Sequence, residues 1–282
     1  MCDQDHFEED LSKYSRRDLG AMAAAGMGAA MLFPQIADAK EVSGRDVSIT
    51  TPDGKCDAFY VTPTAGASPA VLIWPDIFGL RPAFRQMAQR LAESGYSVLV
   101  VNPFYRKQAA PTAKDGASTP IVDVIPLARS LTPETQATDA KAFIGWLDQQ
   151  PEVDTAKKVG TTGYCMGGPI VMRTAASVPT RVGAACTFHG GGLVSDNPDS
   201  PHRLIPKMQA QFLIAIAEND DERDPESKTV LKESFADANL KAEIEVYPAG
   251  HGWCPPDTRV YNEEQAERAW SRMLALFEKA LV

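Results

Sequence analysis

The stretch GTTGYCMGGPI, residues 160–170, has the pattern of a β-strand that turns sharply into a helix. Residues 157–162 favour a short strand, and Pro169 is tolerated in a helical first turn, whose N–H groups lack partners in any case. Between them, Cys165 is flanked two residues away on each side by glycine. Glycines at these places allow a strained turn close to a neighbouring strand and helix. The stretch therefore predicts an α/β fold with Cys165 as a nucleophile at a strand-to-helix turn.

The helix after this turn would direct its N-terminus at the Cys165 sulfur. The free N–H groups and the partial positive charge of a helix N-terminus favour the thiolate, which is the reactive form of cysteine. The alternative explanation is a buried structural cysteine in a glycine-rich turn. Residues elsewhere in the chain decide between these two explanations.

Strand and helix patterns alternate from residue 70 onward, as in a parallel sheet that helices cover on both faces. Ahead of this region, residues 46–50 and 57–62 alternate apolar and polar side chains across a Pro-Asp-Gly turn and predict an antiparallel hairpin. The predicted parallel strands are residues 70–74, 97–101, 157–162, 182–188, 211–217 and 242–247. The predicted helices are residues 84–94, 133–149, 169–176, 225–239 and 262–280. The connection over residues 102–130 is too long for a passive loop and is a candidate for shaping a pocket.

The chain has 28 basic and 37 acidic residues among its 282, which gives a formal net charge of −9. This acidic balance, without any basic and aromatic-rich stripe, argues against nucleic acid as a partner. The five cysteines are widely spaced with no CxxC pair, and the four histidines are scattered. We therefore expect no metal and no cofactor.

The first 39 residues differ in character from the rest of the chain. The twin arginines at 16–17 precede an uncharged run rich in Ala, Gly and Met over residues 20–33, and the tripeptide Ala-Asp-Ala follows at 37–39. This order is typical of a twin-arginine export signal, and the uncharged run is too short and too weakly apolar for a membrane span. We expect residues 1–39 to be removed and residues 40–282 to form one catalytic domain that works in the periplasm or outside the cell. An Ala-rich helix or a tail on a cytoplasmic protein is the alternative.

Three reactive side chains follow predicted strands, whose carboxyl ends form the ligand-binding edge of a parallel sheet. These are Cys165, Asp220 and His251. The chain order of nucleophile, acid and histidine is that of the α/β-hydrolase triad. In such a site His251 keeps the thiol deprotonated and later protonates the leaving group, while Asp220 holds the imidazole in the right tautomer. Asp221 and Asp224 remain alternatives for the acidic member, and Asp224 is also placed to cap the next helix.

The sequence resembles the dienelactone hydrolase family of α/β-hydrolases from about residue 47 to its C-terminus. Four motifs carry the resemblance: WPDIFGL at residues 74–80, NPFYR at 102–106, GYCMGG at 163–168 and GHG at 250–252. The resemblance implies an α/β-hydrolase fold with a mostly parallel central sheet. The residues that it implies for the reaction are the triad Cys165, Asp220 and His251, and an oxyanion hole made by the backbone N–H groups of Ile77 and Met166.

The resemblance also implies which residues contact the thiol or bind the substrate. Asp76 stands where the family usually has a glutamate that contacts the thiol, and its side chain is shorter by one methylene. Arg106 matches the arginine that binds the substrate carboxylate. The family's second such arginine has no match, because Trp253 lies in this part of the sequence and Arg259 is a weak stand-in. Trp253 is itself a candidate to contact the substrate or the thiol. His189 is expected near the pocket mouth without a chemical role.

These residues predict a hydrolase of small esters or lactones that works through an acyl-enzyme, and the resemblance implies that it is of the carboxymethylenebutenolidase type. Because the second arginine is missing, hydrolysis is a stronger expectation than dienelactone as the substrate. Two alternatives stay open: the same triad can carry out acyl transfer or peptide cleavage, or Cys165 can act as a redox sensor that cycles through sulfenic acid. The lack of a resolving CxxC cysteine, together with the presence of Asp220 and His251, weighs against the redox sensor.

Overall fold

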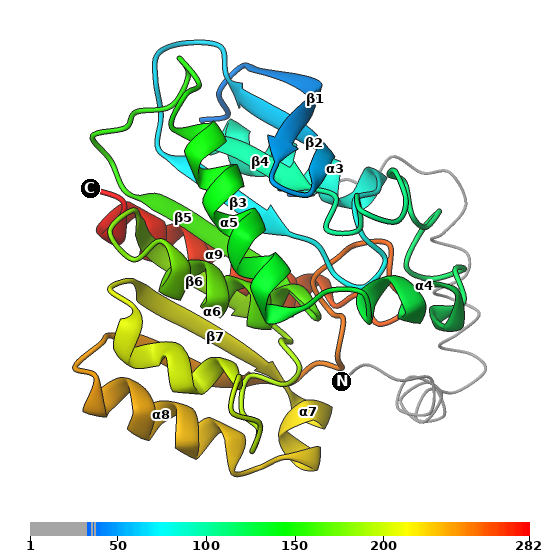
Figure 1. Cartoon of the computed structure of the whole chain (residues 1–282), viewed down its shortest axis with the longest axis vertical. Helices are drawn as coiled ribbons and strands as arrows, with labels where there is room; N and C mark the ends of the chain where they lie inside the picture. Colours follow the sequence, from blue (N-terminus) through cyan, green and yellow to red (C-terminus); the bar gives the residue numbers. More distant parts are fainter. Residues whose placement is uncertain (1–32, 35, 37) are drawn as a thin grey trace.

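One mixed β-sheet runs through the chain, of which the computed structural model describes residues 33, 34, 36 and 38–282 (Figure 1). Within these residues, eight strands lie in the order β1-β2-β4-β3-β5-β6-β7-β8. The strands are β1 (Val42–Thr51), β2 (Gly54–Pro63), β3 (Ala70–Trp74), β4 (Ser97–Val101), β5 (Val159–Tyr164), β6 (Val182–Phe188), β7 (Gln211–Ala217) and β8 (Ala242–Tyr247). The helical segments are α3 (Pro82–Glu93), α4 (Ile121–Ala128), α5 (Pro133–Leu147), α6 (Gly167–Ser177), η1 (Pro201–Lys207), α7 (Glu218–Arg223), α8 (Ser227–Asp237) and α9 (Glu263–Ala280).

The first two strands form the predicted antiparallel hairpin. β1 pairs with β2 along its whole length, and β2 runs antiparallel to β4. Each later pair of neighbours, from β4 across to β8, is parallel. All residues of β3, β4 and β5 are buried, as expected for central strands covered on both faces. The predicted fold, a mostly parallel sheet with an N-terminal hairpin, is confirmed.

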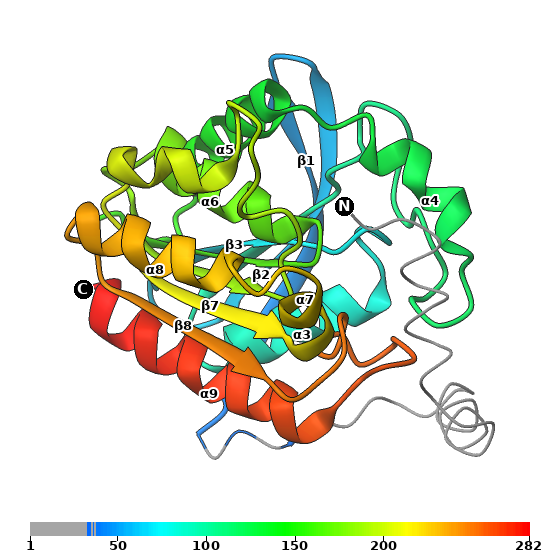
Figure 2. The same cartoon turned by 90° about the horizontal axis from the view of Figure 1, so that it is seen from below.

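Helices cover both faces of this sheet (Figure 2). The buried side chains of α5, α6 and α8 pack with Leu72 and Trp74 of β3, whereas those of α3 and α9 pack with Val71 and Ile73. Alternate β3 residues thus point to opposite faces, with the two-residue period of a strand. Because the strands from β3 to β8 share one direction, the loops that follow them emerge at one edge of the sheet. The functional residues predicted from the sequence lie in these loops.

The sequence does not predict three of the helical segments, namely α4, η1 and α7. α4 lies in the long connection after β4, has a proline at position 126 and has no side-chain cap. α7 has six residues and follows β7 directly. Segments this short do not repeat the apolar spacing by which longer helices are recognised.

The predicted export signal over residues 1–39 falls almost entirely outside the described residues. The signal, its cleavage, the exported location and the single catalytic domain therefore stay predictions. In the part of the chain that the structure describes, no helix has both the length and the apolar character needed to cross a bilayer.

Candidate active site

Cys165 lies between β5 and α6, at the predicted strand-to-helix turn. Its φ is 51°, in the left-handed region that residues with a side chain seldom adopt. The flanking glycines are needed for reasons of space: a Cβ on Gly163 would lie 2.3 Å from the Gly167 carbonyl oxygen, and a Cβ on Gly167 would lie 2.4 Å from that of Trp74. A larger residue at either position would push the backbone out of this turn. The turn therefore holds Cys165 at the carboxyl edge of the sheet.

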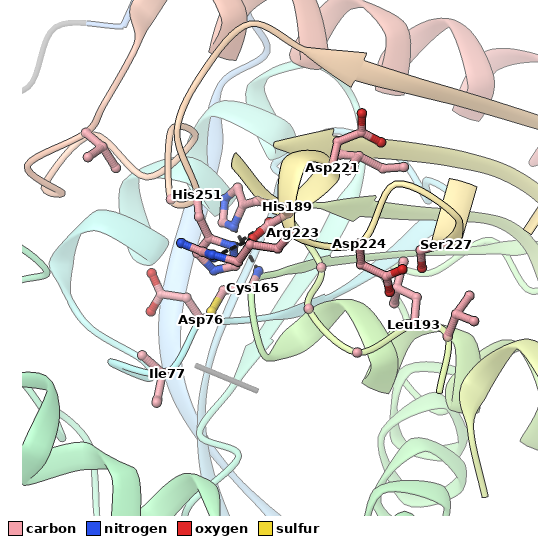
Figure 3. Close-up of a pocket in the computed structure, with 18 of the residues that line it drawn as sticks. Asp76, Ile77, Cys165, His189, Leu193, Asp221, Arg223, Asp224, Ser227 and His251 are labelled. Carbon is pink, nitrogen blue, oxygen red and sulfur yellow. Dashed lines mark hydrogen bonds and ion pairs between the residues drawn. The ribbon is translucent and has the colours of Figure 1, made fainter. Parts of the chain in front are cut away.

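A cavity of about 400 Å³ opens at this edge (Figure 3). Cys165, Asp220 and His251 all contribute to its wall. They follow three different parallel strands, β5, β7 and β8. The structure thus brings the three predicted triad residues together in one cavity.

The short helix α7 holds His251 at two points. Asp220 Oδ2 lies 2.6 Å from His251 Nδ1, and the Asn219 side-chain carbonyl accepts the backbone N–H of His251 at 2.8 Å. With Nδ1 facing the carboxylate, Nε2 is the ring nitrogen on the side away from Asp220, as proton transfer to and from a nucleophile requires. Sequence reasoning missed Asn219, because its contact is with a backbone group 32 positions later and a single asparagine carries no distinctive signal.

The two alternative acids have other positions. Asp221 accepts from the Lys228 ammonium at 2.6 and 2.8 Å. Asp224 is the C-cap residue of α7. Since the Nδ1 of His251 contacts Asp220, the geometry favours Asp220 as the acidic member of the triad.

The two predicted oxyanion donors both lie close to Cys165 in the fold. Met166 follows it in the chain as the N-cap residue of α6, and Ile77 lines the cavity after β3. Among the described residues, no hydrogen bond takes up the backbone N–H of either one. Ile77 belongs to a tight turn in which the Asp76 carboxylate accepts from the Phe78 N–H at 2.9 Å. Two such backbone donors are what a developing oxyanion needs.

A buried ion network holds the turn that contains Ile77. Arg81 is 1% exposed, and its guanidinium donates to both carboxylate oxygens of Asp76, at 2.6 and 2.9 Å, and to both of Asp257, at 2.6 and 2.8 Å. Asp257 also accepts the Gly116 N–H at 3.2 Å. These charge-assisted hydrogen bonds tie together the loops after β3, β4 and β8. All three loops contribute to the cavity wall.

Asp76 lines the cavity with Cys165, but its carboxylate contacts within the described chain are with Arg81 and Phe78. The short side chain keeps the carboxylate inside its own turn. Burial raises the pKa of the Asp76 carboxyl above its ordinary value, and the neighbouring Arg81 charge opposes that rise. Through these contacts Asp76 shapes the turn that contains Ile77.

The structure does not bring Arg106 into the cavity. Its guanidinium donates to Asp139 at 2.7 and 2.8 Å and to Asp53 at 2.6 and 3.0 Å. It also stacks over the Tyr105 ring, 4.5 Å from the centroid. The expectation that Arg106 binds a substrate carboxylate is therefore wrong for this arrangement. The cavity wall contains Arg223 and Arg259 instead.

We expect Arg106→Met to leave substrate recognition unchanged and to weaken the fold. The KM for a carboxylate-bearing ester and that for its uncharged isostere should stay in the same ratio within about twofold. The free energy of unfolding should fall by roughly 1.5–3 kcal/mol, because the nearly buried Asp139 loses its charged partner. Steady-state kinetics and chemical denaturation measure the two effects, with Arg259→Met as the variant in the cavity wall. A rise in KM for the charged ester alone would show instead that Arg106 takes part in substrate binding.

Trp253 lies outside the cavity wall, whereas His189 lines the cavity from a buried position. Trp253 is fully buried; it stacks on Tyr247, with 5.4 Å between centroids, and meets His189 edge-on at 5.0 Å. His189 is 1% exposed, and its Nδ1 accepts the backbone N–H of Cys165 at 3.1 Å. Its ring also lies 5.1 Å from the ring of His251. The contact of His189 with the Cys165 backbone is not one that the sequence predicted, and Trp253, a predicted contact for the substrate or the thiol, packs against His189 outside the cavity wall.

The chain matches the model of the dienelactone hydrolase family over residues 56–281. A Synechocystis protein with the provisional name carboxymethylenebutenolidase is 30% identical over 244 residues, which cover 83% of this chain and 96% of that protein. Carboxymethylenebutenolidase 1 of Cupriavidus pinatubonensis is 24% identical over 245 residues, with 86% and 96% covered.

Solved structures agree with this result at the level of the fold. A Klebsiella pneumoniae protein, provisionally described as a dienelactone hydrolase, superposes with a TM-score of 0.74 at 24% identity, covering 85% of this chain and all of that one. A dienelactone hydrolase-like promiscuous phosphotriesterase from metagenomic libraries gives 0.71 at 23% identity, covering 86% and 99%. Because the family model extends from the second strand to the end of the last helix, the chain belongs to the dienelactone hydrolase family.

Proposed function

We propose that the chain hydrolyses small esters or lactones through Cys165, His251 and Asp220, by way of an acyl-enzyme on Cys165. Membership of its family makes it a hydrolase that acts on ester or lactone bonds. One observation carries the assignment of residues: His251 Nδ1 lies 2.6 Å from Asp220 Oδ2 in the wall of the cavity that Cys165 also lines. A strained cysteine, an imidazole and a carboxylate in this relation have the parts of a nucleophilic triad.

In the proposed reaction, the Cys165 thiolate attacks the carbonyl carbon, and the π electrons move onto the carbonyl oxygen. The N–H groups of Ile77 and Met166 stabilise this oxyanion, and losing one such donor typically costs about 10²–10³ in rate. When the oxyanion collapses, the C–O bond to the leaving group breaks and His251 protonates the departing oxygen. Water then attacks the thioester while His251 takes its proton, and the acid leaves as the thiolate is regenerated.

The cavity supports a substrate with a sizeable apolar part. Its volume of about 400 Å³ lies within the range of small-molecule sites. On the side toward α8, the wall includes Leu193, Ile216 and Leu231. Of the charged residues there, Asp221 and Lys228 form an ion pair at 2.6 Å. We propose that the apolar portion of the ester or lactone lies against these aliphatic side chains.

Intact mass spectrometry after brief exposure to a panel of activated esters and lactones tests this function. We expect a single acyl adduct that maps to Cys165 and disappears as product forms. The other described cysteines serve as internal controls, because Cys56, Cys186 and Cys254 are buried and lie outside the cavity wall. Burial raises the pKa of each of these three thiols, which keeps them protonated and unreactive.

Other outcomes would contradict the proposal in distinguishable ways. Turnover without any adduct on Cys165 in a rapid quench, and undiminished in Cys165→Ala, would place the chemistry elsewhere. Rapid oxidation of Cys165 by peroxide with no acylation would favour the redox sensor. Products formed with added alcohols or amines in preference to water would favour acyl transfer.

A further inference from the structure

We propose that His189 is a positioning residue for both the nucleophile and the base of this site. Its Nδ1 holds the backbone of Cys165, and its ring supports the ring of His251. The proposal rests on the roles proposed above for Cys165 and His251, and it adds a fourth side chain to the proposed triad.

The contact with the nucleophile is a hydrogen bond to its main chain. The Cys165 N–H is shared between the Phe188 carbonyl oxygen at 3.0 Å and His189 Nδ1 at 3.1 Å. Cys165 has a φ of 51°, so its backbone is held in a conformation that residues with a side chain rarely adopt. A second acceptor for its N–H stabilises that conformation, and the direction of the Cα–Cβ bond, and hence of the sulfur, depends on it.

The backbone of His189 is itself strained. Its φ is 41°, directly after β6, and its own N–H donates to the Ala215 carbonyl oxygen at 2.8 Å. The next three residues, 190–192, are all glycine, which adopts this conformation without steric cost. A histidine at the strained position, beside three glycines, indicates that the imidazole itself is needed there. β5 and β6 are paired up to Tyr164 and Phe188, so the strained residues Cys165 and His189 leave the sheet at the same level.

The turn of the nucleophile and the loop of His189 also touch through their glycines. A Cβ on Gly168 would lie 2.6 Å from the Gly190 Cα, which shows how closely the first turn of α6 approaches this loop. The two segments therefore pack backbone against backbone at this point. The geometry couples the two segments.

The ring of His189 is held as a neutral imidazole. Because Nδ1 accepts a hydrogen bond, the proton is on Nε2, which is buried and has no hydrogen-bond partner among the described residues. The rings of Trp253 and His251 pack edge-on around it, at 5.0 and 5.1 Å between centroids. Burial, and then the charge of the neighbouring His251, lower the pKa of His189 well below its usual range. His189 thus stays neutral while His251 takes up a proton, so it supports the base without competing for the proton.

The matched variants His189→Asn and His189→Gln test this role in the whole chain. The asparagine amide oxygen can take the place of Nδ1, and asparagine tolerates the left-handed conformation, whereas the longer glutamine carries its amide one bond further out. We expect His189→Gln to lower kcat by about 10–10²-fold with KM nearly unchanged, and His189→Asn to recover most of that loss. The rate at which iodoacetamide alkylates Cys165, followed from pH 5 to pH 9, should shift with Gln and return toward wild type with Asn.

The alkylation rate separates this proposal from the proposed function. If the wild-type protein hydrolyses no ester in the panel, the pH profile of Cys165 alkylation still compares the two variants. Equal behaviour of both variants and the wild type would overturn the positioning role. An equal loss in both variants, with equal loss of thermal stability, would also overturn it and leave His189 as a packing residue.

Discussion

Cys165→Ala and His251→Ala are each expected to lower kcat/KM for an activated ester by about 10⁴-fold or more, and the double variant is expected to be no slower than either single one. The reason is that the thiolate and the imidazole act as one unit, so removing either member removes the whole pathway. The residual rate would come from water attack on substrate held in the cavity. Initial rates with a p-nitrophenyl ester measure the effect, and thermal unfolding shows that each variant is folded.

Two neighbouring carboxylates in α7 supply the matched control for this experiment. Asp220→Asn removes the charge 2.6 Å from His251 Nδ1 and should lower kcat by several orders of magnitude, about 10⁴ in the best-known triad of this kind. Asp221→Asn removes a charge of equal size that is paired with Lys228, and it should change kcat little. The triad would be contradicted if the losses in activity of Cys165→Ala and His251→Ala multiplied in the double variant. It would also be contradicted if Asp221→Asn lost more activity than Asp220→Asn.

The parts of the site that the sequence predicted are those with local causes. The small-x-Cys-x-small pattern around Cys165 lies within five residues of chain, so the turn can be recognised from the sequence, although the space that Gly167 must leave is set by the distant Trp74. The strand before Asp220 is recognised as an apolar run, and the strand before His251 alternates apolar residues with glutamates. Once those strands are placed in one parallel sheet, the rule that ligands bind at the carboxyl edge brings the residues together.

The errors arose where a residue's role depends on a distant partner. Arg106 matches a family motif, but its position is set by Asp139, 33 residues later, and by Asp53 in the hairpin turn. The contact of His189 with Cys165 was not predicted because it crosses between two strands. In both cases the residue type was visible in the sequence, and the neighbours that determine its chemistry were not.

The role of Asp76 also depends on a partner that lies far away in the sequence. The loss of one methylene, relative to the glutamate usual in the family, is visible in the sequence. The reason the shorter side chain is useful is its bidentate contact with Arg81, which in turn contacts Asp257, 176 residues away. This network is also the part of the site where a single substitution should affect stability most.

Arg81→Met is expected to lower the free energy of unfolding by about 3–5 kcal/mol at neutral pH. The substitution keeps most of the volume of the side chain but leaves the carboxylates of Asp76 and Asp257, both about 5% exposed, without their shared cation. The loss in free energy of unfolding, relative to the wild type, should grow as pH rises. Burial already raises the pKa of the Asp76 carboxyl, and removing Arg81 takes away the charge that opposes this rise, so the folded variant binds more protons than the unfolded chain and loses stability as pH rises through that range. Urea denaturation at pH 5 and pH 8 measures both effects.

Two comparison variants show whether the loss of stability in Arg81→Met comes from the buried charges. Arg272→Met breaks an ion pair with Glu243 at the surface, where the arginine side chain is 51% exposed, and should cost no more than about 1 kcal/mol. Adding Asp76→Asn and Asp257→Asn to Arg81→Met removes the unpaired charges while an amide oxygen can still accept the Phe78 N–H, so much of the stability should return. If Arg81→Met were as mild as Arg272→Met, or if the triple variant were less stable than the single one, unpaired buried charge would not explain the loss of stability, and it would not be what links the turn of Ile77 to the loop of His251.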